Sequence, residues 1–290
     1  MPIYRVKKSY FHPLILTIGV IIGLLMTGPT GAMQDSRPSL PPPQIAAADL
    51  PNGLDLVKQA IETIGGREAF EQITSMSIKG SMSAQKLTLA VEIHTAQNGR
   101  FIYKISIPKG GVRTTGSDGT VGWRLNPDTS GYELLDKADL IENNRQANIH
   151  TILLQVEDRF SRIETISQED FGGKDAYTVR LSSDDGKEEF MFFDTGNQML
   201  LGVKIIDDQE QSFFMQFDDW ETFGEVKLFR KMLLSREGLV LETQFTEITI
   251  NETDPAIFQQ PEQVKKLVAE RENESNKQTP PATTQPDGAG

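Results

Sequence analysis

Residues 87–107 read LTLAVEIHTAQNGRFIYKISI, and this stretch decides the fold class. Apolar side chains occupy every second position on both sides of a central Asn98-Gly99 pair: Leu87, Leu89, Val91, Ile93, Phe101, Tyr103, Ile105 and Ile107. A period of two is typical of a strand with one dry and one wet face, and Asn-Gly is a hairpin-turn signal. The stretch therefore predicts two antiparallel strands joined by a tight turn.

The same alternation returns outward along the chain, at 76–82, 177–181, 199–205 and 213–217, with Gly-containing turns between the runs. Residues 54–64 instead place apolar residues three and four apart, and residues 136–157 show no alternation. Both segments therefore predict helices. We predict a mainly β protein with a few helices (α+β class), built on a large antiparallel sheet of about ten strands.

The N-terminus has the three parts of a secretory signal. Arg5, Lys7 and Lys8 precede an apolar run at 14–26, and small residues follow at 30–32. This order predicts a signal peptide over 1–32, cleavage after Ala32 and export to a periplasmic or extracytoplasmic compartment. If the signal stays uncleaved, residues 14–26 would tether the chain to a membrane.

Composition changes again on both sides of the strand-rich region. Residues 33–49 contain Pro38, Pro41, Pro42 and Pro43, which predicts an extended, Pro-rich linker. We expect the folded domain over 50–261. Residues 262–290 are charged and then rich in Pro, Thr and Gln, which predicts a disordered tail.

Composition excludes several classes of function. The 290 residues include no Cys and three His, and they carry a formal net charge of -12. Without Cys the chain has no disulfide, thiol nucleophile or cysteine zinc site. The acidic balance argues against a nucleic-acid partner, because phosphate binding depends on Lys and Arg patches.

No motif predicts catalysis, a metal site or a cofactor. The acidic loop 184–189 lacks the ligand spacing of a calcium loop, and a hairpin turn accounts for it. His94 falls on the polar side of its strand, which favours a solvent-exposed position over an acid–base site with Glu92 or His150. We therefore predict a protein that is not an enzyme, with no catalytic residue, no metal and no cofactor.

Several turn-plus-strand segments carry a resemblance to a known family. They are AIETIGGREAFEQITSMSIKGSM (60–82), SDGTVGWRLNP (117–127), FGGKDAYTVRL (171–181), FMFFDTGNQMLLGVK (190–204), GEVKLFRKML (224–233) and DPAIFQQP (254–261). Together with the signal and the first helix, these segments resemble the outer-membrane lipoprotein-sorting protein superfamily, the periplasmic lipoprotein carriers and their LolA/LolB-like relatives. The resemblance implies a sheet curled into an incomplete barrel, with helices that cap an apolar cavity for acyl chains.

The family's cavity is made from the dry face of the sheet. The residues that strict alternation places on that face are our ligand-cavity candidates: Leu89, Val91, Ile93, Phe101, Tyr103, Ile105, Trp123, Leu201, Val203, Phe213, Met215 and Phe217. In known carriers a basic residue inside the cavity serves release or retention, and we assign no Arg or Lys of this sequence to that role.

Two functional interpretations remain open. In the first, the protein binds a lipid or the acyl chain of an envelope lipoprotein in the half-barrel cavity. In the second, the core is filled, and the domain is a structural, interaction or envelope-sensor module that binds a partner protein. Size separates them, because a pocket for an acyl chain exceeds about 300 Å³, whereas a packed core has few voids larger than a water molecule.

Overall fold

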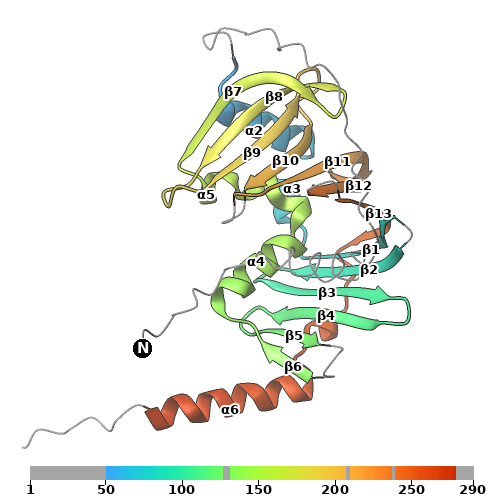
Figure 1. The fold of residues 1–290 in the computed structure, drawn as a ribbon, viewed down its shortest axis with the longest axis vertical. Helices are drawn as coiled ribbons and strands as arrows, with labels where there is room; N and C mark the ends of the chain where they lie inside the picture. Colours follow the sequence, from blue (N-terminus) through green and yellow to red (C-terminus); the bar gives the residue numbers. More distant parts are fainter. Residues whose placement is uncertain (1–49, 86, 127–130, 207–209, 237–238, 279–290) are drawn as a thin grey trace, which may run out of the picture.

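The computed structural model describes residues 50–85, 87–126, 131–206, 210–236 and 239–278. The predicted signal peptide (1–32), the predicted linker (33–49) and the end of the predicted tail (279–290) lie outside the described residues. Figure 1 shows one curled sheet with an upper block of strands, β7–β10, and a lower block, β1–β6.

Thirteen antiparallel strands form the sheet in the order β6-β5-β4-β3-β2-β1-β13-β12-β11-β10-β9-β8-β7. They are β1 (Ser75–Ala84), β2 (Leu87–Ala96), β3 (Arg100–Ile107), β4 (Gly111–Asp118), β5 (Gly122–Asn126), β6 (Gly131–Leu134), β7 (Arg162–Phe171), β8 (Lys174–Ser182), β9 (Glu188–Asp194), β10 (Leu200–Ile206), β11 (Ser212–Phe223), β12 (Val226–Arg236) and β13 (Leu239–Ile250). Sequence neighbours pair as hairpins, and the pairing of β1 with β13 joins the two halves. Because β6 and β7 are the two ends of this order, the sheet stays open, and the predicted fold class is confirmed.

The sheet has more strands than the roughly ten that alternation predicts, because the short strands β4, β5 and β6 are rich in glycine and polar residues. Gly116 in β4 is required by packing. A Cβ at this position would lie 2.5 Å from Ile102 Cδ1 and 2.9 Å from Trp123 Cε2. In these strands a small residue is needed for close packing, so the sequence does not alternate between apolar and polar residues.

Five helical segments lie against one face of the sheet, which we call the inner face; the opposite face is the outer face. They are α2 (Gly53–Thr63), α3 (Arg67–Glu71), α4 (Lys137–Ala147), the 3₁₀ helix η2 (Ile149–Gln155) and α5 (Val156–Arg159). Both helical predictions, for residues 54–64 and 136–157, are thus confirmed. The main hydrophobic core lies between these helices and the inner face.

Helix α2 is firmly seated on the inner face. Leu56, Val57, Ala60 and Ile61 are buried, and the Lys227 amide donates a 2.7 Å hydrogen bond to the carbonyl of Ile64, the C-cap of α2. The spacing of the apolar residues predicted a stripe of Leu54, Val57, Ile61 and Ile64; all of these but the half-buried Leu54 are buried, together with Leu56 and Ala60. Burial of the large side chains stabilises the contact by several kcal/mol, at about 1.5–3 kcal/mol for each.

The structure differs from the disordered tail predicted to begin at residue 262. A 3₁₀ turn η3 (Pro255–Phe258) leads into helix α6 (Glu262–Gln278), which runs along the bottom of the molecule beyond β6 (Figure 1). Phe258 and Val264 are buried in a cluster with Trp123 on the outer face. Composition alone shows too few apolar residues for order, but the folded sheet provides a surface that buries them.

A hydrogen bond also fastens this segment to the sheet. Gln260 Nε2 donates to Asp118 Oδ2 at 2.7 Å. Burial raises the pKa of Asp118, but hydrogen bonds from the Val121 and Thr120 amides and from Gln260 outweigh it and hold the pKa below its usual value. The carboxylate therefore remains a charged acceptor at neutral pH.

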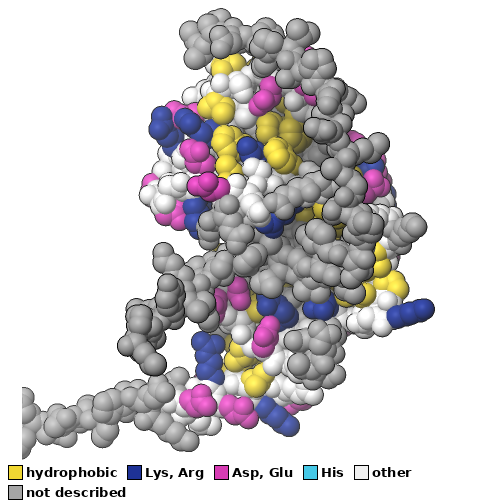
Figure 2. Space-filling view, viewed as in Figure 1, with side chains coloured by type: hydrophobic (Ala, Val, Ile, Leu, Met, Phe, Trp, Pro, Cys, Tyr) yellow, Lys and Arg dark blue, Asp and Glu magenta, His cyan; other side chains and the backbone are white. Residues whose placement is uncertain are grey.

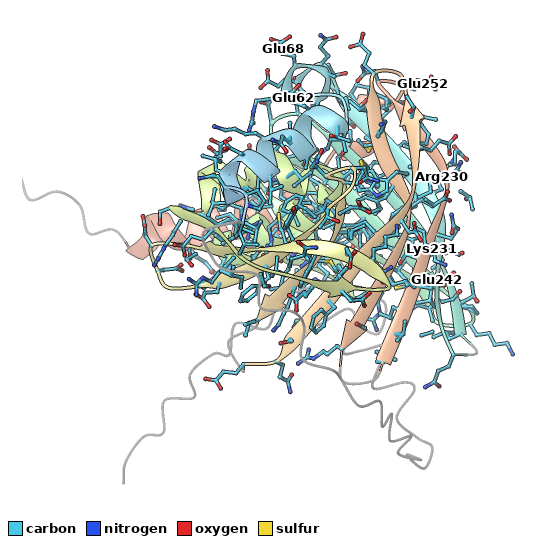
Figure 3. The ribbon with its side chains drawn as sticks, turned by 90° about the horizontal axis from the view of Figure 1, so that it is seen from above. Glu62, Glu68, Arg230, Lys231, Glu242 and Glu252 are labelled. Atoms are coloured by element: carbon cyan, nitrogen blue, oxygen red, sulfur yellow. The ribbon has the colours of Figure 1, made fainter. Side chains whose placement is uncertain are left out.

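The rest of the outer face is a mixture of ion pairs and aromatic rings. Lys231 and Glu242 lie side by side on neighbouring strands (Figure 3), with Nζ and Oε2 3.2 Å apart. Hydrophobic side chains gather on the upper block (Figure 2), where Phe171 stacks on Phe192 with ring centroids 4.0 Å apart. Within the described residues, no helix has both the length and the apolar character to cross a membrane.

Candidate functional site

An apolar pocket lies between the inner face of the sheet and the segment formed by α4 and η2. Residues from β1, β2, β3 and β10–β13 form its wall, and α4 and η2 form its cover. The volume of the cavity is about 80 Å³. This volume is below the ~300 Å³ expected of a pocket for a drug-sized or acyl ligand, so the pocket is nearly closed in this conformation.

Most of the twelve cavity candidates lie on the inner face. Those that line the pocket are Val91, Ile93, Tyr103, Phe213 and Met215. Those that lie in the main core beside the pocket without lining it are Leu89, Phe101, Ile105, Val203 and Phe217. Alternation within β2, β3 and β11 thus identified the wall of the pocket, but not which of its residues border the free space.

Leu201 lies on the outer face instead, in a cluster with Phe192 and Ala176. The cause is an irregularity in β10, whose register with β9 shifts between Leu200 and Gly202. Leu200 and Val203 consequently both belong to the inner-face core. The assumption of strict alternation through 199–205 is wrong at this bulge, because one extra residue reverses the facing of those before it.

Trp123 also lies on the outer face. It is opposite Gly116 in β4, which is opposite Ile102 in β3. Ile102 is the neighbour of the inner-facing Phe101, so Ile102 and the residues opposite it, Gly116 and Trp123, face outward. On that face Trp123 packs against Phe258 and Val264. Trp123 therefore lies outside the pocket.

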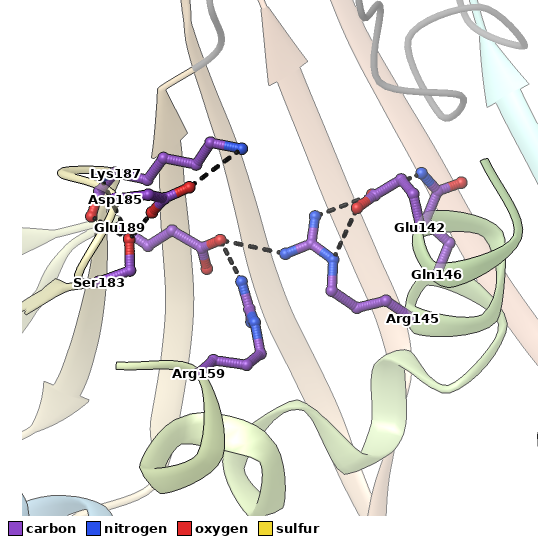
Figure 4. A network of polar contacts seen from close by, with 8 residues as sticks. All are labelled: Glu142, Arg145, Gln146, Arg159, Ser183, Asp185, Lys187 and Glu189. Carbon is purple, nitrogen blue, oxygen red and sulfur yellow. Dashed lines mark hydrogen bonds and ion pairs between the residues drawn. The ribbon is translucent and has the colours of Figure 1, made fainter. Parts of the chain in front are cut away.

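A polar network at the rim of the pocket was not predicted from the sequence (Figure 4). Arg145 of α4 donates to Glu142 Oε1 at 2.8 Å and to Glu189 Oε1 at 3.1 Å. Arg159 of α5 donates to the same oxygen of Glu189, at the start of β9. We call Glu142, Arg145, Arg159 and Glu189 the polar latch, because it joins α4 of the cover, and the neighbouring helix α5, to the sheet.

The latch is charged and largely withdrawn from water. The Arg145 and Glu189 side chains are 16% and 10% exposed. Burial lowers the pKa of Arg145, but the carboxylates of Glu142 and Glu189 outweigh it and hold the pKa above its usual value. The only sequence signal for the latch was the i, i+3 pair of Glu142 and Arg145 on a predicted helix; the contact with Glu189 joins residues 44 positions apart.

The two described histidines are both buried, so the prediction of a solvent-exposed His94 is wrong. His94 is 6% exposed on the outward-facing row of Ile102, and its Nε2 lies 2.5 Å from Glu92 Oε1. His150 in η2 stacks on Phe229 with ring centroids 3.9 Å apart. Burial lowers the pKa of His150 to about 3, so its imidazole is neutral at physiological pH.

The described residues also show what surrounds His150 and the acidic loop 184–189. Neither nitrogen of His150 has a hydrogen-bond partner among them, and they contain no group of three or more His, Asp or Glu suited to a metal ion. In the acidic loop, Asp185 pairs with Ser183 and Lys187 (Figure 4). Gly186 there has φ +83, as a tight turn requires.

Comparisons by sequence find no relative. No protein-family model matches the chain. No curated protein matches it either.

Comparisons by structure find similar folds. A LolA superfamily protein from Nitrosomonas europaea has a TM-score of 0.50 and 11% identity, covering 73% of this chain and 99% of that one. A DUF1329 family protein from Desulfovibrio piger has a TM-score of 0.49 and 13% identity over 72% and 97% of the two chains. A putative outer membrane lipoprotein-sorting protein domain from Vibrio parahaemolyticus has a TM-score of 0.47 and 12% identity over 74% and 97%. At a TM-score of 0.50, the LolA superfamily protein from Nitrosomonas europaea shares its fold with this chain, which confirms at the level of the fold the resemblance seen in the sequence.

Proposed function

We propose that this chain is an exported, non-enzymatic binding protein that holds the acyl chain of a lipid or of an envelope lipoprotein beneath α4. One observation carries the proposal: an apolar wall built from seven strands is covered in part by α4, a helix that buries a single residue, Ala147. A helix held so weakly is suited to open and close over a ligand.

Opening is required, because about 80 Å³ of free space does not hold an acyl chain. We infer that α4 moves away from the sheet when the polar latch breaks. Opening transfers the charges of the latch to water, so its cost stays below the roughly 3–5 kcal/mol of leaving one buried charge unpaired. Burial of an acyl chain contributes about 0.8 kcal/mol for each methylene, so ten methylenes offset that cost.

Native mass spectrometry of the full chain purified without detergent tests the proposal. We expect masses above that of the protein alone, and the extracted material should contain acyl chains. A fluorescent fatty acid such as cis-parinaric acid then gives a binding curve for variants. The Met215→Trp variant fills the pocket and should bind this probe at least tenfold more weakly.

Phe214→Trp is the matched control. Phe214 is the next residue of β11, it faces Lys204 on the other side of the sheet, and its replacement should leave binding unchanged. Equal loss of binding in both variants, or loss of the folded state in Met215→Trp, would contradict a pocket at this position.

The small free volume favours a second candidate, an interaction or envelope-sensor module with a filled core that binds a partner protein. In that case the protein purified without detergent carries no lipid. The probe should then bind wild type and Met215→Trp equally weakly.

The predicted signal supports the exported location, and N-terminal sequencing of the protein from its producing cell tests it. Cleavage after Ala32 gives a chain that starts at Met33. A start before Leu25 contradicts cleavage there, and an intact N-terminus in a membrane fraction would indicate tethering through residues 14–26.

A further inference from the structure

Two side chains with a hydroxyl group lie in the otherwise apolar wall of the pocket, Tyr103 of β3 and Thr243 of β13. Thr243 of β13 is 2% exposed and lines the free space together with Leu241 and Phe245 of the same strand. Its cross-strand neighbours are Met232 on β12 and Met82 on β1, which also line the pocket. The alternation of β13 thus places a hydroxyl where the other inward positions carry large apolar groups.

This hydroxyl has no partner in the described part of the chain. Thr243 Oγ1 is fully buried and makes no hydrogen bond. Neither methionine neighbour can satisfy it, since a thioether sulfur is only a weak acceptor. Buried hydroxyls in proteins are nearly always hydrogen-bonded, so an unpaired one at a pocket wall points to a partner that enters the pocket.

We propose that Thr243 is a specificity-determining residue that donates a hydrogen bond to a carbonyl oxygen of the bound acyl ligand. The inference rests on the proposed function and deepens it, because it assigns the residue that recognises the carbonyl end of the acyl chain. Such a carbonyl is present in an ester-linked lipid chain and in a free fatty acid.

The rim of the pocket favours the ester over the free acid. The polar latch contains two carboxylates and two guanidiniums, so its formal charges cancel. One oxygen of Glu189 remains unpaired and buried among the described residues. The rim therefore offers no net positive charge to a carboxylate, and a neutral ester carbonyl enters without an electrostatic penalty.

Competition of three probes against cis-parinaric acid tests this inference: methyl oleate, oleic acid and 1-octadecene. We expect the wild-type chain to bind methyl oleate about tenfold more tightly than 1-octadecene, which corresponds to one buried hydrogen bond. In Thr243→Val, which keeps the shape and removes the hydroxyl, this ratio should fall to about one. Oleic acid should bind more weakly than the ester in both proteins.

Thr178→Val is the matched control, because Thr178 is also a buried strand residue but its hydroxyl donates to Glu169. This variant should have a lower melting temperature than the wild type and should still prefer methyl oleate to 1-octadecene. Thr243→Val without ligand should gain about 2–4 °C, since it removes an unpaired buried hydroxyl.

Three results overturn the inference. An unchanged ester preference in Thr243→Val contradicts it while leaving the pocket itself intact. A fall in the melting temperature of Thr243→Val shows that the hydroxyl is satisfied inside the protein. Failure of every probe to bind wild type contradicts the proposed function together with the subsite.

Discussion

Helices α2 and α4 are both eleven residues long, and both lie against the inner face of the same sheet. They are held in different ways. Helix α2 buries Gly53, Leu56, Val57, Ala60 and Ile61, whereas α4 buries only Ala147. Besides Ala147 and the half-buried Leu140, α4 is held by the polar latch.

This difference separates a structural helix from a cover. Apolar burial is non-directional and strengthens with area, so α2 leaves the sheet only when the whole domain unfolds. A few polar contacts, by contrast, can break and re-form while the sheet stays intact. We therefore expect α2 to exchange amide protons by global unfolding and α4 by local opening.

The largest expected effect comes from one carboxylate placed on each helix. Val57→Asp puts a charge at a position that is 0% exposed and should cost more than about 4 kcal/mol of unfolding free energy or prevent folding. Ile141→Asp puts the same charge on α4 at a position that is 61% exposed, and should change it by less than about 0.5 kcal/mol. Urea denaturation measures both. Similar costs would remove the distinction between the helices.

The next effect isolates the polar latch. Arg145→Met removes the guanidinium that joins α4 to Glu189 and should lower the free energy of the local opening of α4 by about 2–3 kcal/mol, less than the full cost of a broken buried pair because Arg159 still faces Glu189. The free energy of global unfolding should change little. Hydrogen exchange should accelerate in α4 and not in α2. Arg162→Met is the control, since its pair with Glu164 is exposed and worth about 0–1 kcal/mol. Uniform acceleration in both helices would contradict a local cover.

A third effect concerns η2, the continuation of α4, which is anchored by His150. With a pKa of about 3, the folded imidazole stays neutral at pH values where the unfolded one, with an ordinary pKa of 6.5, takes up a proton. The contribution of His150 to the free energy of unfolding is therefore constant above pH 6.5. As the pH falls from 6.5 toward 3, this contribution destabilises the fold by up to about 1.4 kcal/mol per pH unit.

Between pH 7 and pH 5, the His150 contribution amounts to about 2 kcal/mol. His150→Leu should remove this part of the acid sensitivity, measured as the free energy of unfolding in urea at both pH values. Parallel losses in wild type and variant would show that His150 is not buried in the neutral form.

The smallest expected effect compares the helix caps. The Asn52 side chain accepts a hydrogen bond from the Leu54 amide at 2.9 Å, and Asp136 accepts one from the Asp139 amide at 2.8 Å. Asn52→Ala should lower global stability by about 1 kcal/mol. Asp136→Ala should leave the urea midpoint nearly unchanged and speed exchange in α4 alone. A global loss in Asp136→Ala would place α4 in the same cooperative unit as α2.

The sequence was informative wherever the structure is periodic over many residues. The alternation in 87–107 predicted β2, β3 and the facing of Val91, Ile93 and Tyr103, because a strand side chain has only two directions to point. The apolar stripe of 54–64 likewise predicted α2. Prediction failed at Leu201 and Trp123, since a bulge and a glycine-rich strand interrupt the period without leaving a signal.

Contacts between residues far apart in the chain could not be predicted from the sequence, for a different reason. In the sequence, Thr243 is one more β-branched residue of a strand. Only the structure shows that its neighbours on the adjacent strands are Met82 and Met232. Glu189 is one more acid in an acidic loop until Arg145 and Arg159 reach it. In both cases the chemistry depends on which partners are absent or present in space.

By itself, then, the amino-acid sequence determined the fold class, the positions of the helices on the inner face and the dry face of the sheet, because backbone periodicity and apolar burial act over short distances along the chain. Only the tertiary structure decided that α4 is held by a polar latch, that α6 finds a surface on which to order, and that an unpaired hydroxyl lies in the pocket wall. These features arise from long-range packing, where one shifted register or one distant charge changes what a side chain meets.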